Sequence, residues 1–248
     1  MRVIVTRPAA QAVSWLDELR SHGLDAEALP LIGIAPAQDL QAVRHAWAQL
    51  PQAARVMFVS ANAVEQFFAA RPPDTAWPPD LPAASTGPGT TAALRAAGLS
   101  HIEEPAPDSP QFDSEALWTR IASWPWAGQT VVVVRGEDGR DWLGQQLHAA
   151  GAQLHFVSAY RRLAPTLDVP GRALLAQALA EPAAHCWLFS SSQAVGHLLR
   201  LAPGAEWAAS WALASHPRIA QAARDAGFGR VDLVGPGADA VLQHLGVA

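Results

Sequence analysis

Hydroxyl and glycine residues stand where short apolar runs give way to helical patterns. One such place is a G-x-G-x-x-A hexapeptide, Gly87 to Ala92, which follows the apolar run at 81–86. The first turn of a helix leaves N–H groups unbonded and carries a partial positive charge, which favours an anion by about 0.3–1 kcal/mol when exposed. These places could therefore bind a phosphate or a carboxylate. The residues concerned are Ser60, Thr86, Gly87, Thr90, Ser190, Ser191 and Ser215.

A nucleotide site needs more than the hexapeptide. A dinucleotide fingerprint follows a long strand, and an acidic residue about 20 positions later binds the ribose. Here the preceding run is short and contains Pro82, and Glu103 or Asp108 would have to be the acid. The equivalent place in the second half of the chain, 215–220, contains no glycine. A nucleotide-dependent enzyme stays an alternative, but the sequence favours a helix-start turn that offers N–H groups to an anion.

The composition limits the classes of chemistry and of partner. All 17 basic residues are arginine, so Schiff-base and Walker-type lysines are excluded. The single cysteine, Cys186, excludes a disulfide framework and a cysteine-based metal site. A net charge of −5 without a basic tail argues against nucleic acid and against an anionic membrane. The sequence shows neither a signal peptide nor a membrane span, so we expect a cytoplasmic protein.

The elements that must position these residues alternate between strands and helices. Each short apolar run is followed by a helical pattern, the first helix being expected at 11–23, and this rhythm is typical of parallel α/β proteins. Four consecutive valines at 131–134 mark the clearest buried strand. The predicted strands are 2–6, 55–60, 81–86, 129–135, 185–190, 211–215 and 230–235.

The second half of the chain repeats the first at a nearly constant offset. The segment 3–5 returns at 131–133, 60–64 at 191–195, and 85–99 at 214–228. Segments 30–39 and 160–170 also match each other, each through an Ala-Pro pair. We therefore expect two similar α/β units, with these two segments as the connections between them.

Taken together, these landmarks resemble the uroporphyrinogen-III synthase family. The resemblance spans nearly the whole chain in the expected order. It implies two parallel-sheet, flavodoxin-like α/β domains joined by a two-stranded connection, with the active site in the cleft between them. The chain would leave the first domain and return to it, giving domains of 1–35 plus 167–248 and of 36–166. The matching pieces are "VTRP", "LPLIGIAP", "FVSANAV", "STGPGTTAALRAAG", "VVRGEDGRDWLGQQLHAAGA", "YRRLAP", "FSSSQAV" and "SHPRIAQAARDAGF".

The reaction implied by the resemblance is the cyclisation of a linear tetrapyrrole, hydroxymethylbilane, to uroporphyrinogen III. Water is lost and ring D is inverted through a spiro intermediate, a step of porphyrin and heme biosynthesis. The resemblance implies neither a metal nor an organic cofactor. Every pyrrole carries an acetate and a propionate, and helix-start N–H groups, hydroxyls and a few arginines suit such a polyanion. We expect a monomer, with the preceding pathway enzyme as a candidate partner.

Tyr160 is the residue that the resemblance assigns to the chemistry. It is the only tyrosine in the chain and matches the active-site tyrosine of the family. Its repeat partner lies near Ile32, so it is not part of the shared scaffold. We expect Tyr160 to donate a proton to the leaving hydroxyl, and Arg7 and Arg135 to bind substrate carboxylates with the residues named above.

Each of these assignments has a structural alternative. The serines could cap helices, Arg7 could brace a strand end, and Tyr160 could be an idle strand-end residue. Glu137 and Asp138 are expected to cap the helix that follows the turn at 135–140. Family members often carry a threonine where this chain has Arg218 and Ile219, so it stays open whether Arg218 replaces that contact.

Two readings of the whole chain follow. The first is a cofactor-free cyclising lyase of this family. The alternative is a non-catalytic two-domain protein that binds a small polycarboxylate. The unmatched phenol of Tyr160 favours the enzyme, because binding alone does not need it.

Overall fold

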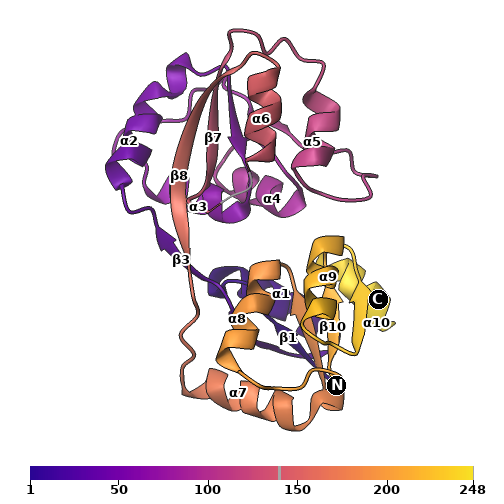
Figure 1. Cartoon of the computed structure of the whole chain (residues 1–248). Helices are drawn as coiled ribbons and strands as arrows, with labels where there is room; N and C mark the ends of the chain where they lie inside the picture. Colours follow the sequence, from indigo (N-terminus) through magenta and orange to yellow (C-terminus); the bar gives the residue numbers. More distant parts are fainter. Residues whose placement is uncertain (139–140, 248) are drawn as a thin grey trace. The chain divides into compact units, whose positions relative to one another are not determined.

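The computed structural model describes residues 1–138 and 141–247, and Figure 1 shows its ribbon. Contacts divide the chain into two compact units, which we call unit 1 (Met1–Gly33 with Leu163–Ala248) and unit 2 (Ile34–Arg162). The domain boundaries predicted from the sequence, 35/36 and 166/167, lie a few residues beyond these divisions. That each unit folds as an independent domain stays a prediction.

Unit 1 is an α/β structure built from both ends of the chain. Its strands are β1 (Arg2–Val5), β2 (Asp25–Ala28), β9 (His185–Phe189), β10 (Trp211–Ala214) and β11 (Arg230–Leu233). Its helices are α1 (Ala9–Ser21), α7 (Val169–Ala180), α8 (Ser192–Leu201), α9 (Pro217–Asp225) and α10 (Ala238–Leu245), with a 3-10 turn at Pro182–Ala184. The strands form one parallel sheet in the order β11-β10-β9-β1-β2.

Unit 2 is an α/β structure built from the middle of the chain. Its strands are β3 (Gly33–Pro36), β4 (Arg55–Phe58), β5 (Ala83–Ser85), β6 (Ile102–Glu103), β7 (Thr130–Gly136) and β8 (Gln153–Leu163). Its helices are α2 (Leu40–Gln49), α3 (Ala61–Ala69), α4 (Pro88–Ala96), α5 (Ser114–Ile121) and α6 (Trp142–Ala149), with a 3-10 turn at Leu50–Gln52. The sheet order is β3-β8-β7-β4-β5-β6.

The two sheets have the same strand order, but the strand that comes first in the chain occupies a different position of that order in each unit. Numbered from β1, the strands of unit 1 follow the flavodoxin-like order 2-1-3-4-5. Numbered from β7, through β8 and then β4 to β6, the strands of unit 2 give the same order, with β3 added at the edge. Unit 2 is therefore a circular permutation of unit 1, and this confirms the predicted fold class and the internal repeat.

The chain passes between the units through two neighbouring strands. It enters unit 2 at Gly33/Ile34, within β3, and leaves it at Arg162/Leu163, at the end of β8. Because β3 and β8 are adjacent in the sheet, the connection is two-stranded.

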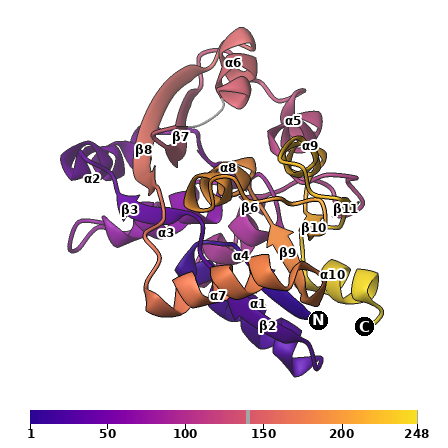
Figure 2. The ribbon, with the colours of Figure 1, turned by 60° about the horizontal axis from the view of Figure 1, so that its bottom comes forward.

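Successive residues of each strand point to opposite faces of the sheet, and both faces are buried, as expected for parallel strands covered by helices on both sides. In unit 2, Val56 and Phe58 pack with residues of α2, α3 and α4, whereas Met57 packs with residues of α5 and α6. Both views show α2 on the other side of β7 and β8 from α5 and α6 (Figures 1 and 2). In unit 1, Val3 and Val5 pack with residues of α1 and α10.

The first helix differs in position from the prediction. We expected it at 11–23, but α1 spans Ala9–Ser21. Gly23 has φ = +81°, a left-handed conformation that follows a helix end and does not belong to the helix itself. Pro8 is the N-cap, so the helix begins directly after it.

Candidate active site

The strand order gives each unit one place where a ligand is expected. In open α/β sheets, ligands bind beyond the carboxyl ends of the strands, where neighbouring strands lead to helices on opposite faces. In unit 2 this switch point lies between β7 and β4, and in unit 1 between β1 and β9. The residues that directly follow these strands are therefore the first to consider.

Tyr160 lies in β8, next to β7, and its hydroxyl reaches the switch point of unit 2 at Ser60. Its side chain is 1% exposed, and the ring belongs to the hydrophobic core of the unit. The phenol oxygen lies 3.1 Å from the Ser60 Oγ and accepts a hydrogen bond from the Arg162 Nη2 at 3.3 Å. Ser60 follows β4 and Tyr160 lies in β8, so the fold brings together two residues that the sequence named independently.

The Tyr160 ring has room because residue 136 is glycine. The β7–β8 pairing shifts register between Arg135 and Gly136, so that Gly136 lies opposite Tyr160. A Cβ at position 136 would lie 2.9 Å from the Tyr160 Cζ, closer than real Cβ contacts. The backbone is held as well, because the Glu137 N–H donates to the Tyr160 carbonyl at 2.9 Å. Sequence reasoning missed Gly136, since its pattern gives no sign of the shift in register.

Ser60 combines two roles that the sequence offered as alternatives. It is the N-cap of α3, and its Oγ accepts a hydrogen bond from the Ala63 N–H at 3.2 Å. The same oxygen is the partner of the Tyr160 hydroxyl. Its side chain is partly exposed, in contrast to that of Tyr160.

The start of α4 offers an anion fewer hydrogen-bond donors than the hexapeptide suggests. Pro88 has no N–H, and the N–H groups of Thr90 and Thr91 donate to the Gly87 carbonyl. The Thr91 hydroxyl is buried between Ser85 and Glu104, at 2.6 and 2.7 Å. Thr90 is 6% exposed and Thr86 partly buried. What remains for an anion is the Thr86 and Thr90 hydroxyls and the N–H groups of the two glycines.

Position 87 also needs glycine for packing. A Cβ there would lie 2.8 Å from the Phe112 Cβ. The loop that carries Phe112 therefore closes directly over the helix start, and this contact alone accounts for one of the two glycines of the motif.

Arg135 lies near the end of β7, and Glu137, Asp138 and Asp141 follow this strand. The Arg135 Nη1 donates to the Asp141 Oδ1 at 2.7 Å, and its guanidinium lies 5.5 Å from the Phe156 ring. Asp141, not Glu137 or Asp138, is the N-cap of α6, so the expected capping by these two residues was wrong. Glu137 instead accepts a hydrogen bond from the Gln38 N–H at 3.3 Å. The last two residues of the 135–140 turn, 139 and 140, lie outside the described part of the chain.

Arg7 follows β1 at the switch point of unit 1. Its guanidinium lies 4.4 Å from the centre of the Trp15 ring, and its Nη1 donates to Gln11 at 3.5 Å. Its Nε is buried without a hydrogen-bond partner, and the described residues give Arg7 no carboxylate partner. Burial away from water lowers the pKa of Arg7 to about 10. A partly buried guanidinium without a carboxylate partner gains free energy when it binds an anion, so Arg7 is suited to bind a carboxylate of a ligand.

The serines of unit 1 lie at two helix starts. Ser190 and Ser191 follow β9, and Ser191 caps α8 by accepting from the Gln193 N–H at 3.2 Å. Ser215 follows β10, and its N–H donates to the Phe189 carbonyl at 3.2 Å. The N-cap of α9 is His216, whose Nδ1 accepts from the Arg218 N–H. The Arg218 side chain is exposed.

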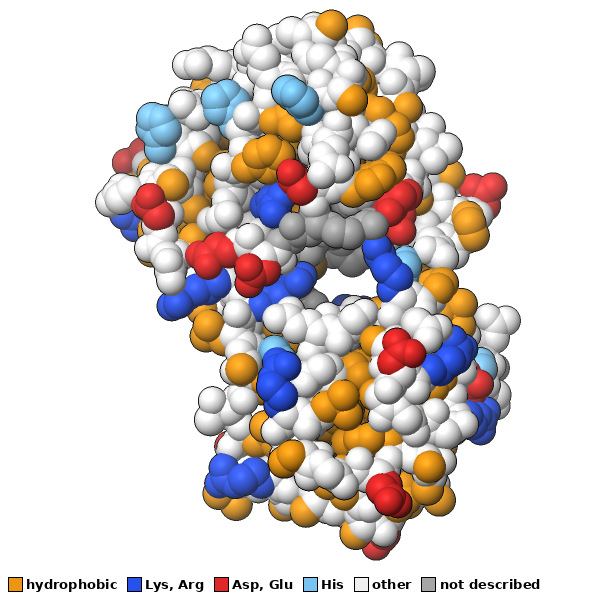
Figure 3. Space-filling model, viewed as in Figure 1, with side chains coloured by type: hydrophobic (Ala, Val, Ile, Leu, Met, Phe, Trp, Pro, Cys, Tyr) orange, Lys and Arg blue, Asp and Glu red, His pale blue; other side chains and the backbone are white. Residues whose placement is uncertain are grey.

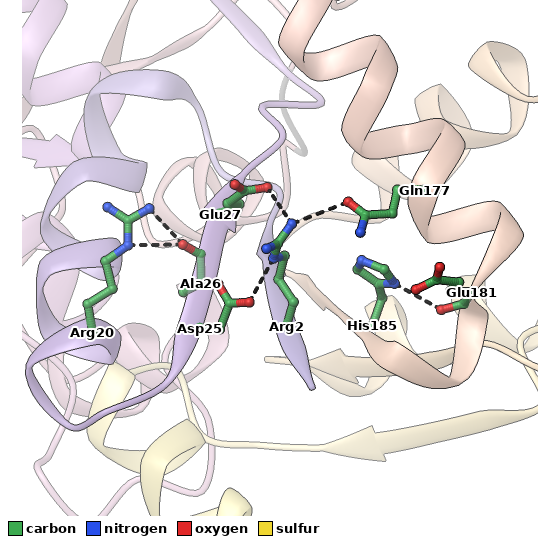
Figure 4. A network of polar contacts seen from close by, with 8 residues as sticks. All are labelled: Arg2, Arg20, Asp25, Ala26, Glu27, Gln177, Glu181 and His185. Carbon is green, nitrogen blue, oxygen red and sulfur yellow. Dashed lines mark hydrogen bonds and ion pairs between the residues drawn. The ribbon is translucent and has the colours of Figure 1, made fainter.

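A separate cavity of about 680 Å³ lies in unit 1 between the edge strand β2 and α7. Arg2, Glu27 and Gln177 line it and bond to one another through the Arg2 guanidinium, as Figure 4 shows. Arg2 also pairs with Asp25 at 2.9 Å, so its charge is already neutralised. None of the candidate residues named from the sequence lines this cavity.

The described residues contain no group of three or more His, Cys, Asp or Glu side chains that could hold a metal ion. No helix formed by them is long and apolar enough to cross a membrane. On the face shown in Figure 3, the basic side chains lie singly or beside acidic ones.

Comparisons with known proteins agree with the resemblance. The family model described as "Uroporphyrinogen-III synthase HemD" matches residues 14–243. The uroporphyrinogen-III synthase of Escherichia coli K12 is 31% identical over 183 residues, which is 72% of each chain. That of Salmonella typhimurium is 29% identical over 169 residues, 68% of each chain.

Solved structures match in fold. A uroporphyrinogen III synthase mutant from the extremely thermophilic bacterium Thermus thermophilus gives a TM-score of 0.61 at 18% identity, covering 99% of this chain and 97% of the other. The enzyme from Helicobacter pylori 26695 gives 0.61 at 14% identity, with both chains fully covered. At these identities the likeness concerns the fold alone, but the family match extends over most of the sequence. The chain belongs to the uroporphyrinogen-III synthase family.

Proposed function

We infer that this chain closes the linear tetrapyrrole hydroxymethylbilane to uroporphyrinogen III, with loss of water and inversion of ring D. The family match supports the activity. The observation that carries the chemistry is the hydroxyl of the only tyrosine, held by Ser60 and Arg162 at the switch point of unit 2. The comparisons give no support to a non-catalytic binding protein.

Tyr160 supplies the proton in this proposal. The bond between the terminal carbon and the hydroxyl oxygen breaks, the proton joins that oxygen, and water leaves. The azafulvene cation that remains is attacked by the substituted carbon of ring D. The spiro intermediate then fragments and recloses with ring D inverted, and a proton is released at the end. The chain must hold the tetrapyrrole so that this route is faster than simple head-to-tail closure.

The carboxylates of the substrate are bound by hydroxyls, helix-start N–H groups and arginines. We assign this role in unit 2 to Ser60, Thr86, Gly87, Thr90 and Arg135, and in unit 1 to Arg7, Ser190, Ser191 and Ser215. Arg7 is the strongest candidate, because its partly buried guanidinium has no carboxylate partner among the described residues. Arg135 would have to exchange Asp141 for the substrate. We also propose that the chain acts as a monomer in the cytoplasm.

The test is turnover of hydroxymethylbilane without any added metal or organic cofactor, followed by separation of the type I and type III isomers. We expect the type III isomer to predominate with the intact chain. In Tyr160→Phe the fold should persist and the rate of type III formation should fall by about 10- to 100-fold, because the proton donor is lost. The loss should not be complete, because a phenol is a weak acid at neutral pH and contributes only part of the catalysis. A product no richer in the type III isomer than the uncatalysed mixture would refute the proposed function.

A further inference from the structure

We propose that the proton of Tyr160 reaches the substrate through Ser60, and that Arg162 is the positioning residue that sets the direction of this transfer. The proposal rests on the proposed function and deepens it. It starts from a mismatch of exposure, because the Tyr160 side chain is 1% exposed and lies in the core of unit 2. Ser60, its hydrogen-bond partner, is partly exposed and is the member of the pair that a substrate can touch.

The partners of the phenol oxygen fix where its hydrogen points. A guanidinium only donates hydrogen bonds, so the Arg162 Nη2 uses an acceptor site on that oxygen. The only other partner of the phenol among the described residues is the Ser60 Oγ at 3.1 Å. The phenol satisfies its own hydrogen only by donating to Ser60.

The partners of Ser60 then fix where the serine hydrogen points. The Ser60 Oγ accepts from the Ala63 N–H and, in this arrangement, from Tyr160. A hydroxyl has two acceptor sites and one hydrogen, so both acceptor sites are used and the hydrogen is left to donate outward. The chain Arg162–Tyr160–Ser60 therefore runs in one direction and ends in a hydroxyl donor at the switch point.

The carbon–oxygen bond of the hydroxymethyl group breaks and its electron pair leaves with the oxygen, which takes the Ser60 hydrogen and departs as water. The Tyr160 hydrogen moves to the Ser60 Oγ at the same time. The phenolate left behind faces the Arg162 guanidinium, which stabilises its charge. The proton released when the closed ring regains its aromatic form restores the phenol.

Three substitutions of Ser60 separate proton transfer from helix capping. Ser60→Thr keeps both the hydroxyl and the cap, Ser60→Asn keeps a capping oxygen without a transferable proton, and Ser60→Ala loses both. We expect kcat to fall on the order of 100-fold in the Asn and Ala variants, a larger change than the rise in KM that a lost carboxylate contact at Ser60 would cause, and to stay within about 3-fold in the Thr variant. If the Asn variant restores kcat as well as the Thr variant does, Ser60 acts only as a cap and the proposal is wrong.

The single tyrosine gives a readout that does not depend on activity. With tyrosine labelled by ¹³C at Cζ, the full chain shows one tyrosine resonance, which is sensitive to hydrogen bonds at the phenol oxygen. Arg162→Gln and Ser60→Ala should each move it, whereas Arg161→Gln, next in the sequence, should not. An unmoved resonance in Arg162→Gln would overturn the role of Arg162.

Different results would refute the proposed function and the proton relay. An intact chain that does not enrich the type III isomer refutes the function. An intact chain that enriches it, while Ser60→Ala and Ser60→Asn keep the full kcat, refutes only the relay.

Discussion

At the scale of single residues, the tyrosine depends on the absence of a side chain opposite it. Gly136 leaves the space that the Tyr160 ring fills, and its backbone is not in the left-handed region. The need for glycine at this position is therefore steric. A side chain there would displace the ring and with it the hydroxyl that bonds to Ser60.

We predict that Gly136→Ala destabilises the chain by about 1–3 kcal/mol, the usual cost of overpacking, and lowers the rate of type III formation by about 10-fold. Unfolding in urea and isomer analysis measure the two effects. The control is Gly196→Ala in α8, where the new Cβ would lie 3.8 Å from its nearest neighbour, the Arg200 Nη1. This change should stabilise the helix by about 0.5–1 kcal/mol. Equal stabilities of the two variants would show that the ring adapts to the methyl group.

Arg7 illustrates a conflict between binding and stability. The folded pKa of Arg7, about 10, lies below that of an ordinary arginine, so the charge weakens the fold at every pH below about 10. This weakening is relieved as the pH rises above about 10, because the guanidinium of the folded chain loses its proton before that of the unfolded chain. A bound carboxylate would remove the same penalty at neutral pH.

Arg7→Met should therefore unfold at the same or a higher temperature than the parent chain, in the absence of substrate. Its KM should rise by about 10-fold or more, because a charge-assisted hydrogen bond is worth about 1.5–3 kcal/mol. Thermal unfolding and steady-state kinetics provide the measurements. A lower melting temperature together with an unchanged KM would mean that Arg7 only braces the strand end.

At the scale of the elements, the start of α4 divides its two threonines between different tasks. The Thr91 hydroxyl links Ser85 to Glu104, which also pairs with Arg95. Thr90, one position earlier, has no such link among the described residues. Thr91 holds the helix in place, whereas Thr90 is the residue that we propose for ligand binding.

Valine substitutions test this division at nearly constant shape. Thr91→Val leaves buried polar partners without their hydrogen bond and should cost about 1–3 kcal/mol of unfolding free energy, with KM unchanged. Thr90→Val should keep the unfolding free energy within about 0.5 kcal/mol and raise KM by about 3- to 10-fold. The reverse result would exchange the roles of the two residues.

The elements also show what could be predicted from the sequence. Continuous apolar runs such as Val131 to Val134 mark buried strands, and these predictions were confirmed. β8 was missed, because its first half carries exposed residues such as His155 and Phe156, which break the apolar pattern. The pairing of Tyr160 with Ser60 could not be foreseen either, since it depends on the register shift beside Gly136.

At the scale of the whole molecule, the permuted strand order decides which pieces of the chain can fold alone. Unit 2 is continuous in sequence, whereas unit 1 needs strands from both ends. The internal repeat divides the chain near its middle and would cut through both sheets. The resemblance to the family, and not the repeat, predicted that the chain leaves the first domain and returns to it.

We predict that the fragment 34–162 folds by itself with a cooperative thermal transition, followed by circular dichroism. The fragment 1–128 is of similar length and contains one complete copy of the repeat, yet it should not fold, because it lacks β7 and β8 of one sheet and β9 of the other. Cooperative folding of both fragments would show that the repeat, rather than the spatial unit, is the folding domain.

The two-stranded passage through β3 and β8 has a consequence for synthesis on the ribosome. The apolar strand β1, whose Val3, Ile4 and Val5 are fully buried, is translated before unit 2, yet its neighbour β9 is translated only after all of unit 2. Unit 2 can therefore complete its sheet while the N-terminal segment still lacks its central partner. During that interval the nascent chain carries the apolar strand β1 without its partner β9, while unit 2 is already folded. A ribosome that stalls before residue 185 would release a product in which unit 2 is folded and the N-terminal segment of unit 1 is prone to aggregate. Such a product would be bound by chaperones or degraded by proteases.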